Sequence, residues 1–154
     1  MIDQPYITKT TAQHTAVIHL TIPAADCQKL FGPAVGELMA ALAAQGIAPI
    51  GPLFSHHLKN PTAIFDFEIG VPVAVPVAAA GRVAPGQLPA VTVARTVYHG
   101  PYEGLGNAWG ELSNWIAANS HRPAINLWEN YVSGPADSGD PVTWRTELNR
   151  PLVD

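Results

Sequence analysis

The chain has 154 residues, a net charge of −4 and a sequence pI near 5.8. This length fits one domain with a sizeable core, and 47% hydrophobic against 13% charged residues excludes a disordered chain or a coiled coil. The eight Lys and Arg residues are scattered singly from Lys9 to Arg150, whereas nucleic-acid binders usually carry a basic stripe. We therefore expect no nucleic-acid partner.

Three features of the sequence indicate the compartment. Cys27 is the only cysteine, which excludes an internal disulfide framework and favours a reducing cytoplasm. Residues 1–5 have neither the basic nor the apolar region of a signal peptide. The longest apolar stretch, residues 71–80, is interrupted by Pro72 and Pro76 and is too short to span a bilayer. We expect a cytoplasmic protein without membrane contact.

The first half of the chain reads as strand, helix, strand and strand. Alternating apolar residues over 16–22 predict a half-buried strand. A helix is predicted next, because apolar residues recur at three- and four-residue spacing from Phe31 to Leu42, and Gly46 is a typical helix end. Two further strands are predicted over 53–58 and 63–71.

The second half repeats this order. An alternating segment over 91–97 predicts a strand, and Leu105, Trp109, Leu112 and Ile116 predict a helix. Strands are then predicted over 127–133 and 142–148. Residues 73–89, between the halves, are rich in Pro and Gly but apolar, which favours a strand end plus turn over a free linker.

The two halves are also similar residue by residue. Gly36-Glu37-Leu38 recurs as Gly110-Glu111-Leu112, an offset of 74 that continues to Phe54 and Trp128. Five extra residues around 134–140 raise the offset to 79, which pairs Glu68 with Glu147. We predict one α+β domain over 1–154, a tandem pseudo-twofold repeat of strand–helix–strand–strand modules over about 8–74 and 88–152. Its antiparallel sheets carry helices on one face, with a central cleft for a ligand.

The second half holds the most distinctive motifs. They are His-Gly-Pro-Tyr-Glu at 99–103, Trp-Glu-Asn-Tyr at 128–131 and Thr-Glu-Leu at 146–148, followed by Pro-Leu at 151–152. In combination they resemble the GyrI-like small-molecule-binding family, which includes effector-binding domains of MerR-type multidrug regulators and of some AraC-type regulators. The resemblance covers about residues 8–152. It implies a pocket for bulky aromatic, often cationic, compounds, with Glu129 as the counter-charge.

The residues around Glu129 support this role independently. Strand alternation places Leu127 and Tyr131 on the same face as Glu129. A carboxylate beside aromatic rings is desolvated, which raises its pKa, and a delocalised organic cation supplies the missing charge and stacks on the rings. The alternative is a strand carboxylate that faces solvent or pairs with Arg145 across the sheet.

Six further residues are candidates to line the ligand pocket: Tyr131, Tyr102, Trp128, His57, Phe67 and Trp144. Tyr102 follows the Gly100-Pro101 turn and alternatively packs the helix end onto the sheet. Phe67 and Trp144 are alternatively core residues. His57 corresponds to Tyr131 in the repeat, a departure from the Tyr common among relatives. We expect no metal or cofactor, because the adjacent His56 and His57 point to opposite faces of a strand and the chain lacks a phosphate-binding Gly-rich loop.

The sequence leaves the function open between a binding protein and an enzyme. The first hypothesis is a standalone module that binds or sequesters small amphipathic organic molecules and acts alone or through a protein partner. The second is a hydrolase that opens cyclopropane-containing genotoxins, as some GyrI-like proteins are thought to do, with Glu129 and Tyr131 or Tyr102 as catalytic residues. A protein-interaction adaptor, as in the gyrase-inhibiting branch, is a third hypothesis.

Overall fold

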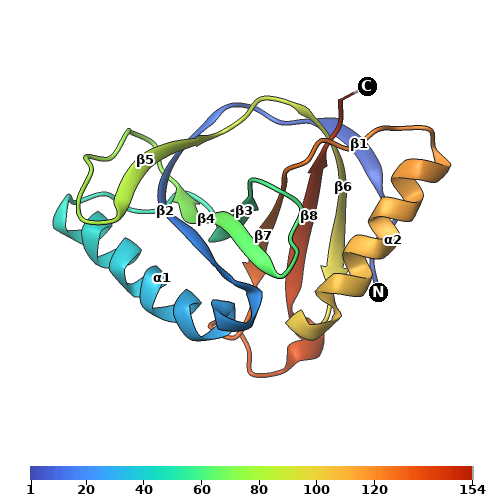
Figure 1. The fold of residues 1–154 in the computed structure, drawn as a ribbon. Coiled ribbons are helices and arrows are strands. Elements are labelled where there is room, and N and C mark those ends of the chain that lie inside the picture. The colour runs from blue at the N-terminus through green and yellow to red at the C-terminus, as the bar shows by residue number, and fades with distance from the viewer. Residues whose placement is uncertain (154) are drawn as a thin grey trace. The chain divides into compact units, whose positions relative to one another are not determined.

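A computed structural model describes residues 1–153 of the chain. By its contacts the chain divides into two units, Thr11–Ala90 and Met1–Thr10 with Val91–Asp154. Each unit combines one long helix with an antiparallel sheet (Figure 1). The predicted α+β class and the repeated strand–helix–strand–strand order are confirmed. The cleft between the modules stays a prediction.

The unit Thr11–Ala90 contains β2 (Gln13–Pro23), α1 (Cys27–Ala44), β3 (Phe54–His57), β4 (Ile64–Pro72) and β5 (Val83–Leu88). Its strands pair antiparallel in the order β5-β2-β4-β3. The helix α1 covers one face of this sheet, because Ala34, Leu38 and Leu42 recur every fourth residue and are buried in its apolar core. The core residues contributed by the sheet include Ile18, Leu20, Phe67 and Ile69.

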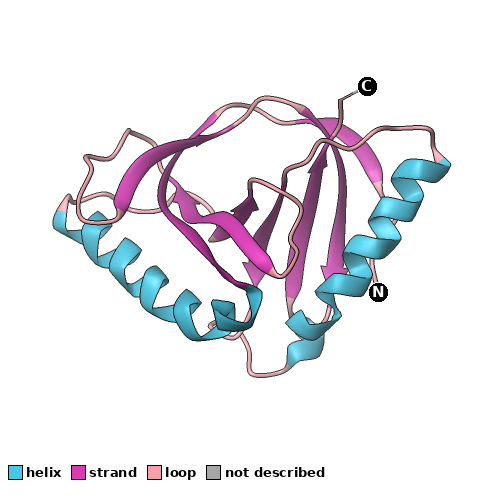
Figure 2. Cartoon of the chain, viewed as in Figure 1, coloured by secondary structure: helices cyan, strands magenta, loops and turns pink. Residues whose placement is uncertain are grey.

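The second unit contains β1 (Tyr6–Lys9), β6 (Thr92–His99), α2 (Leu105–Ala118), β7 (Leu127–Ser133) and β8 (Arg145–Pro151). Its strand order, β1-β6-β8-β7, matches that of the first unit position by position. The long cyan helices in Figure 2 are α1 and α2. Ala108, Leu112 and Ile116 of α2 pack into a core with Ala94, Tyr98 and Leu148 of the sheet.

Strand register supports the repeat found in the sequence. Ser55 pairs with Ile69 between β3 and β4, and Glu129 pairs with Leu148 between β7 and β8. These pairs are related by the offsets of 74 and 79 that the sequence indicates. Residues that correspond in the sequence therefore occupy equivalent places in the two sheets.

Both helices end in the same way. At the end of α1, the Gly46 amide donates to the Ala43 carbonyl and the Ile47 amide donates to the Leu42 carbonyl, with Gly46 at φ +68°. This is a Schellman motif, and it confirms Gly46 as the predicted helix end. In α2 the equivalent left-handed residue is Ser120, at φ +60°, a conformation that a non-glycine residue adopts at some cost.

Two strands were not expected from the sequence, and a third is displaced. These are β5 and β1, and both lie at sheet edges. Pro85 and Gly86 are tolerated within β5 because one side of an edge strand needs no hydrogen-bonding partner. The last strand begins at Arg145 instead of Val142, since Asp140 accepts a hydrogen bond from the Val142 amide and starts a 3₁₀ turn. None of the described helices is both long and apolar enough to cross a membrane.

Candidate functional site

A rigid turn between β6 and α2 presents Tyr102. The buried Tyr98 ring donates its hydroxyl hydrogen to the Pro101 carbonyl at 2.8 Å. Gly100 has a φ of +137°, which only glycine adopts readily, and a methyl group on Gly104 would overlap the Tyr98 hydroxyl. The two glycines therefore let the turn close over Tyr98 and fix where Tyr102 emerges.

Glu129 is a buried carboxylate with two neutral hydrogen-bond donors. It lies on β7 with 8% of its surface exposed. The Trp109 indole of α2 donates to its Oε1 atom at 2.7 Å, and the Tyr131 hydroxyl donates to its Oε2 atom at 2.9 Å. Among the described residues, both oxygens are thus hydrogen-bonded without help from a cationic side chain.

Burial sets the protonation of this carboxyl. Loss of water raises the pKa of Glu129 above its ordinary value, although the hydrogen bonds from Trp109 and Tyr131 act in the opposite direction. The burial effect is the larger one. The ionised form of Glu129 is therefore costly in the free protein, and a positive charge beside it would relieve that cost.

Aromatic rings flank Glu129. The Tyr102 ring lies 5.8 Å from the Tyr131 ring and 5.1 Å from the Trp144 ring, measured between centroids. Trp144 is held in place because its indole donates to the Ser138 carbonyl at 2.9 Å. Burial raises the pKa of Tyr102, with further contributions from the negative charges of Glu129 and Asp137. We call Glu129, Tyr131, Tyr102, Trp144 and Trp109 the acidic aromatic cluster.

Gly134 gives Tyr102 its space. A methyl group at this position would come within 2.5 Å of the Tyr102 hydroxyl. We expect Gly134→Ala to displace the Tyr102 ring from Trp144, which loss of nuclear Overhauser effects between the two rings would report. Gly139→Ala in the same loop is the matched control, because a methyl group there meets no atom within 4 Å. An unchanged Tyr102–Trp144 contact in Gly134→Ala would contradict this account.

The structure decides against the alternative considered for Glu129 and places Trp128 apart from it. Arg145 does not pair with Glu129, since its guanidinium donates to the carbonyls of Val142 and Trp144, and Glu129 does not face solvent. Trp128 is not brought to the acidic aromatic cluster. It is buried opposite Asn149 and, by strand alternation, projects from the other face of β7.

Trp109 is the residue that sequence reasoning missed. Its helical spacing indicates only an apolar side chain directed at the sheet. A buried indole N–H also needs a hydrogen-bond acceptor, and Glu129 is the carboxylate that β7 of the same module offers. This requirement is the signal in the amino-acid sequence that could have linked Trp109 to Glu129.

Within the unit Thr11–Ala90, His57 and Phe67 lie together in an aromatic cluster. The His57 ring stacks on Phe67 at 5.0 Å and meets Phe65 edge-on at 5.1 Å. Phe67 also belongs to the core, which was the alternative expected for it. Burial, aided by the neighbouring His56, lowers the pKa of His57 to about 4, so this imidazole is neutral at physiological pH.

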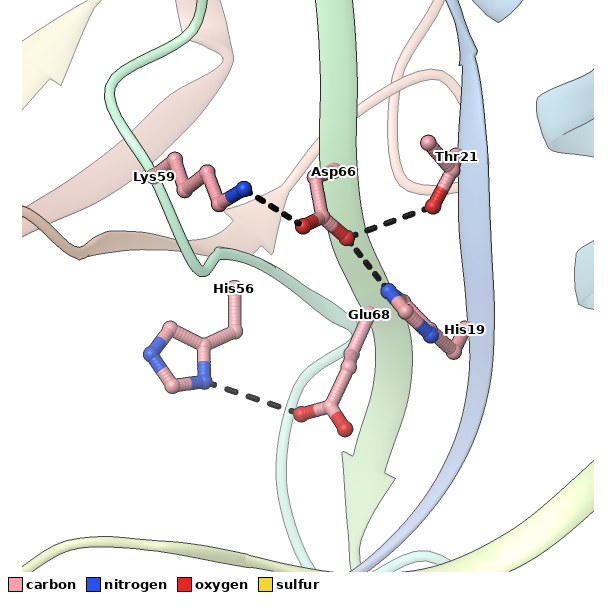
Figure 3. A network of polar contacts seen from close by, with 6 residues as sticks. All are labelled: His19, Thr21, His56, Lys59, Asp66 and Glu68. Atoms are coloured by element: carbon pink, nitrogen blue, oxygen red, sulfur yellow. Dashed lines mark hydrogen bonds and ion pairs between the residues drawn. The ribbon is translucent and has the colours of Figure 1, made fainter.

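The other face of β4 carries a partly exposed polar network (Figure 3). Asp66 accepts hydrogen bonds from His19 and Thr21 and lies 4.0 Å from the Lys59 ammonium. His56 faces Glu68, with 3.7 Å between Nδ1 and Oε1. His56 and His57 therefore project to opposite faces, as expected. Among residues 1–153 no group of three or more His, Cys, Asp or Glu side chains is arranged to hold a metal ion.

One protein family matches this sequence over nearly its whole length. The family model described as the GyrI-like small molecule binding domain matches residues 3–152. The chain belongs to the GyrI-like family. The resemblance expected from the motifs is thereby confirmed. No curated protein matches the sequence.

Solved structures share the GyrI-like fold. The C-terminal domain of EcmrR is 22% identical with a TM-score of 0.86, and the match covers 98% of each chain. In the EcmrR–DNA complex the identity is 23% and the TM-score 0.84, over 97% of this chain and 57% of EcmrR. This chain thus spans little more than half of EcmrR.

Two more distant structures have the same fold. A hydrolase encoded by lin2189 from Listeria innocua is 14% identical with a TM-score of 0.69, over 97% of this chain and 92% of that one. SAV2435, solved with tetraphenylphosphonium bound, is 10% identical with a TM-score of 0.66, over 98% and 94%. Identities this low show the fold alone.

Proposed function

We propose that this small-molecule-binding domain binds bulky aromatic cations, with Glu129 as counter-charge and the rings of Tyr102, Tyr131 and Trp144 as stacking surfaces. One observation carries the proposal: Glu129 is buried among aromatic side chains, and its described hydrogen bonds come from neutral donors. A delocalised cation compensates the carboxylate at small desolvation cost, and contact with the ring faces adds about 0.5–2 kcal/mol. Binding of tetraphenylphosphonium by the similarly folded SAV2435 supports this ligand class.

The proposal predicts selection by charge. We expect saturable binding of tetraphenylphosphonium by the full chain, measured by isothermal titration calorimetry at pH 7.5. Triphenylphosphine oxide presents the same kind of rings without charge, and we expect it to bind about tenfold more weakly, because it leaves Glu129 uncompensated. Equal affinities for the two compounds, or no binding of the cation, would refute a role for the carboxylate charge.

A hydrolase is the second candidate. The Tyr131 hydroxyl lies 2.9 Å from Glu129 Oε2 and the pKa of Glu129 is raised, which is the arrangement that general acid–base chemistry requires. The fold shared with the Listeria innocua hydrolase favours the same function. Water addition to a cyclopropane-bearing electrophile, followed by mass spectrometry, separates the candidates. Turnover that Glu129→Gln abolishes would support the hydrolase, and cation binding without turnover would support the binding protein.

A further inference from the structure

His99 is a motif residue to which the proposed function gives no role. It ends β6 and stands directly before the Gly100-Pro101 turn that presents Tyr102. Its imidazole faces Asp3, with 2.8 Å between Nε2 and Oδ1, and its backbone amide donates to the Met1 carbonyl at 2.9 Å. His99 therefore joins the turn to residues 1–3.

Residues 1–3 are anchored along β6 by contacts of their own. The Asp3 amide donates to the Val97 carbonyl at 3.0 Å, and the Asp3 carbonyl accepts from the buried Thr96 hydroxyl at 2.7 Å. Ile2 forms a bridge with Tyr98 and packs against the core that includes α2. This segment is thus a fixed support at the end of β6.

The turn between this support and Tyr102 is held at each residue. The Gly100 amide donates to the Trp144 carbonyl at 3.1 Å, and the Pro101 carbonyl accepts a hydrogen bond from β6. Gly100, with a φ of +137°, is the most flexible point of the turn, so the path of the chain there depends on the residues fixed on either side. The anchor at His99 fixes one of those sides.

We propose that Asp3 and His99 are positioning residues for Tyr102: their contact holds the start of the turn and so keeps the Tyr102 ring against Trp144. Its consequence for binding rests on the proposed function, in which that ring is a stacking surface for the ligand. Asp3 and His99 act through the ring and not by contact with the ligand. The coupling is reciprocal, so an occupied acidic aromatic cluster also holds residues 1–3 more firmly on β6.

The exposure of the pair sets the size of the effect. The Asp3 side chain is 57% exposed and that of His99 is 32% exposed, so water screens the pair and its contribution is modest. We expect loss of the Asp3 side chain to weaken ligand binding by about two- to fivefold. The alternative is a direct effect of the Asp3 charge on a bound cation, which an uncharged ligand would not experience.

A double-mutant cycle tests whether Asp3 acts through Tyr102. Asp3→Ala should weaken binding of tetraphenylphosphonium to the full chain, and of triphenylphosphine oxide by the same factor, because both ligands contact the ring. Tyr102→Ala removes the ring, so adding Asp3→Ala to it should cause no further loss. Asp26→Ala removes an exposed carboxylate of the other unit and is the control, which should leave both affinities unchanged.

The free protein gives a readout that needs no ligand. Asp3→Ala should weaken the nuclear Overhauser effects between the Tyr102 and Trp144 rings, whose centroids lie 5.1 Å apart, and leave those within the α2 core in place. In the wild type, saturation with tetraphenylphosphonium should slow hydrogen exchange of the His99 amide, a measurement that does not depend on the folding of a variant.

Three outcomes would overturn the positioning role. The first is an equal loss of affinity from Asp3→Ala in the wild-type and Tyr102→Ala backgrounds, which would show that Asp3 acts by another route. The second is an unchanged Tyr102–Trp144 contact in free Asp3→Ala, which decides the matter even if tetraphenylphosphonium does not bind and the proposed function fails. The third is unchanged exchange of the His99 amide in the saturated wild type.

Discussion

Replacing Glu129 by Gln is expected to lower the affinity for tetraphenylphosphonium by about 30-fold. A unit charge pair 5 Å apart interacts by about 3 kcal/mol at an effective dielectric constant of 20, and desolvation of the cation removes part of this. Gln keeps the shape of the side chain. Its amide oxygen still accepts from Trp109, and its amide nitrogen can donate to the Tyr131 hydroxyl. The loss therefore reports charge, and isothermal titration calorimetry measures it.

Glu111→Gln is the matched control for this variant. Glu111 is exposed on α2, so the same change of net charge there should leave the affinity within about twofold of the wild type. The free Glu129→Gln protein should also be more stable than the wild type at neutral pH. The pKa of Glu129 is higher in the folded state than in the unfolded state. Its contribution to the free energy of unfolding therefore falls as the pH rises above the pKa of the unfolded state. Unchanged affinity in Glu129→Gln would remove this residue from the binding site.

Acidification is expected to destabilise the protein through His57. The pKa of His57 is about 4 in the folded state and 6.5 in the unfolded state. Between these values the unfolded chain binds a proton that the folded chain does not, so stability is full above pH 6.5 and falls as the pH drops towards 4. The loss is about 1.4 kcal/mol per pH unit, or about 3 kcal/mol over the window. Urea unfolding at pH 7.5 and at pH 4.5 measures it.

His57→Phe should flatten this dependence, because phenylalanine does not titrate and retains the stack on Phe67. His14→Asn on the same sheet is the control, since His14 is exposed. Glu129 acts in the opposite sense within this window, so the comparison is best made in the Glu129→Gln background as well. Equal pH dependence in His57→Phe and the wild type would disprove the assignment to His57.

Periodicity predicted most of the fold because each module buries one face of each element. The alternation in β6 and the four-residue spacing of Leu38 and Leu42 are direct consequences of that burial. The edge strand β5 lacked such a pattern, since Pro85 and Gly86 interrupt it and pairing with β2 alone defines the strand. Whether a segment pairs with the edge of a sheet depends on tertiary contacts, and the hydrophobic pattern of the segment itself does not show it.

The candidate site was predictable to the extent that it follows from one strand. Alternation places Glu129 and Tyr131 on one face of β7, and their hydrogen bond agrees with that. The same alternation places Trp128 on the opposite face of β7 from Glu129. Trp109 lay outside such reasoning because its contact crosses from α2 to β7, and the approach of a helix to a strand depends on the packing of the whole unit.

The hydrogen bond between Trp109 and Glu129 joins a helix to a strand through a titratable group. A hydrogen bond to an ionised acceptor is about twice as strong as one to a neutral acceptor. Protonation of the carboxyl therefore weakens the tie between α2 and the sheet, whereas a cation beside Glu129 favours the ionised form and so maintains the tie. On the proposed function, a bound cation would therefore be felt at α2, because the same carboxylate that faces the ligand also accepts the hydrogen bond from that helix.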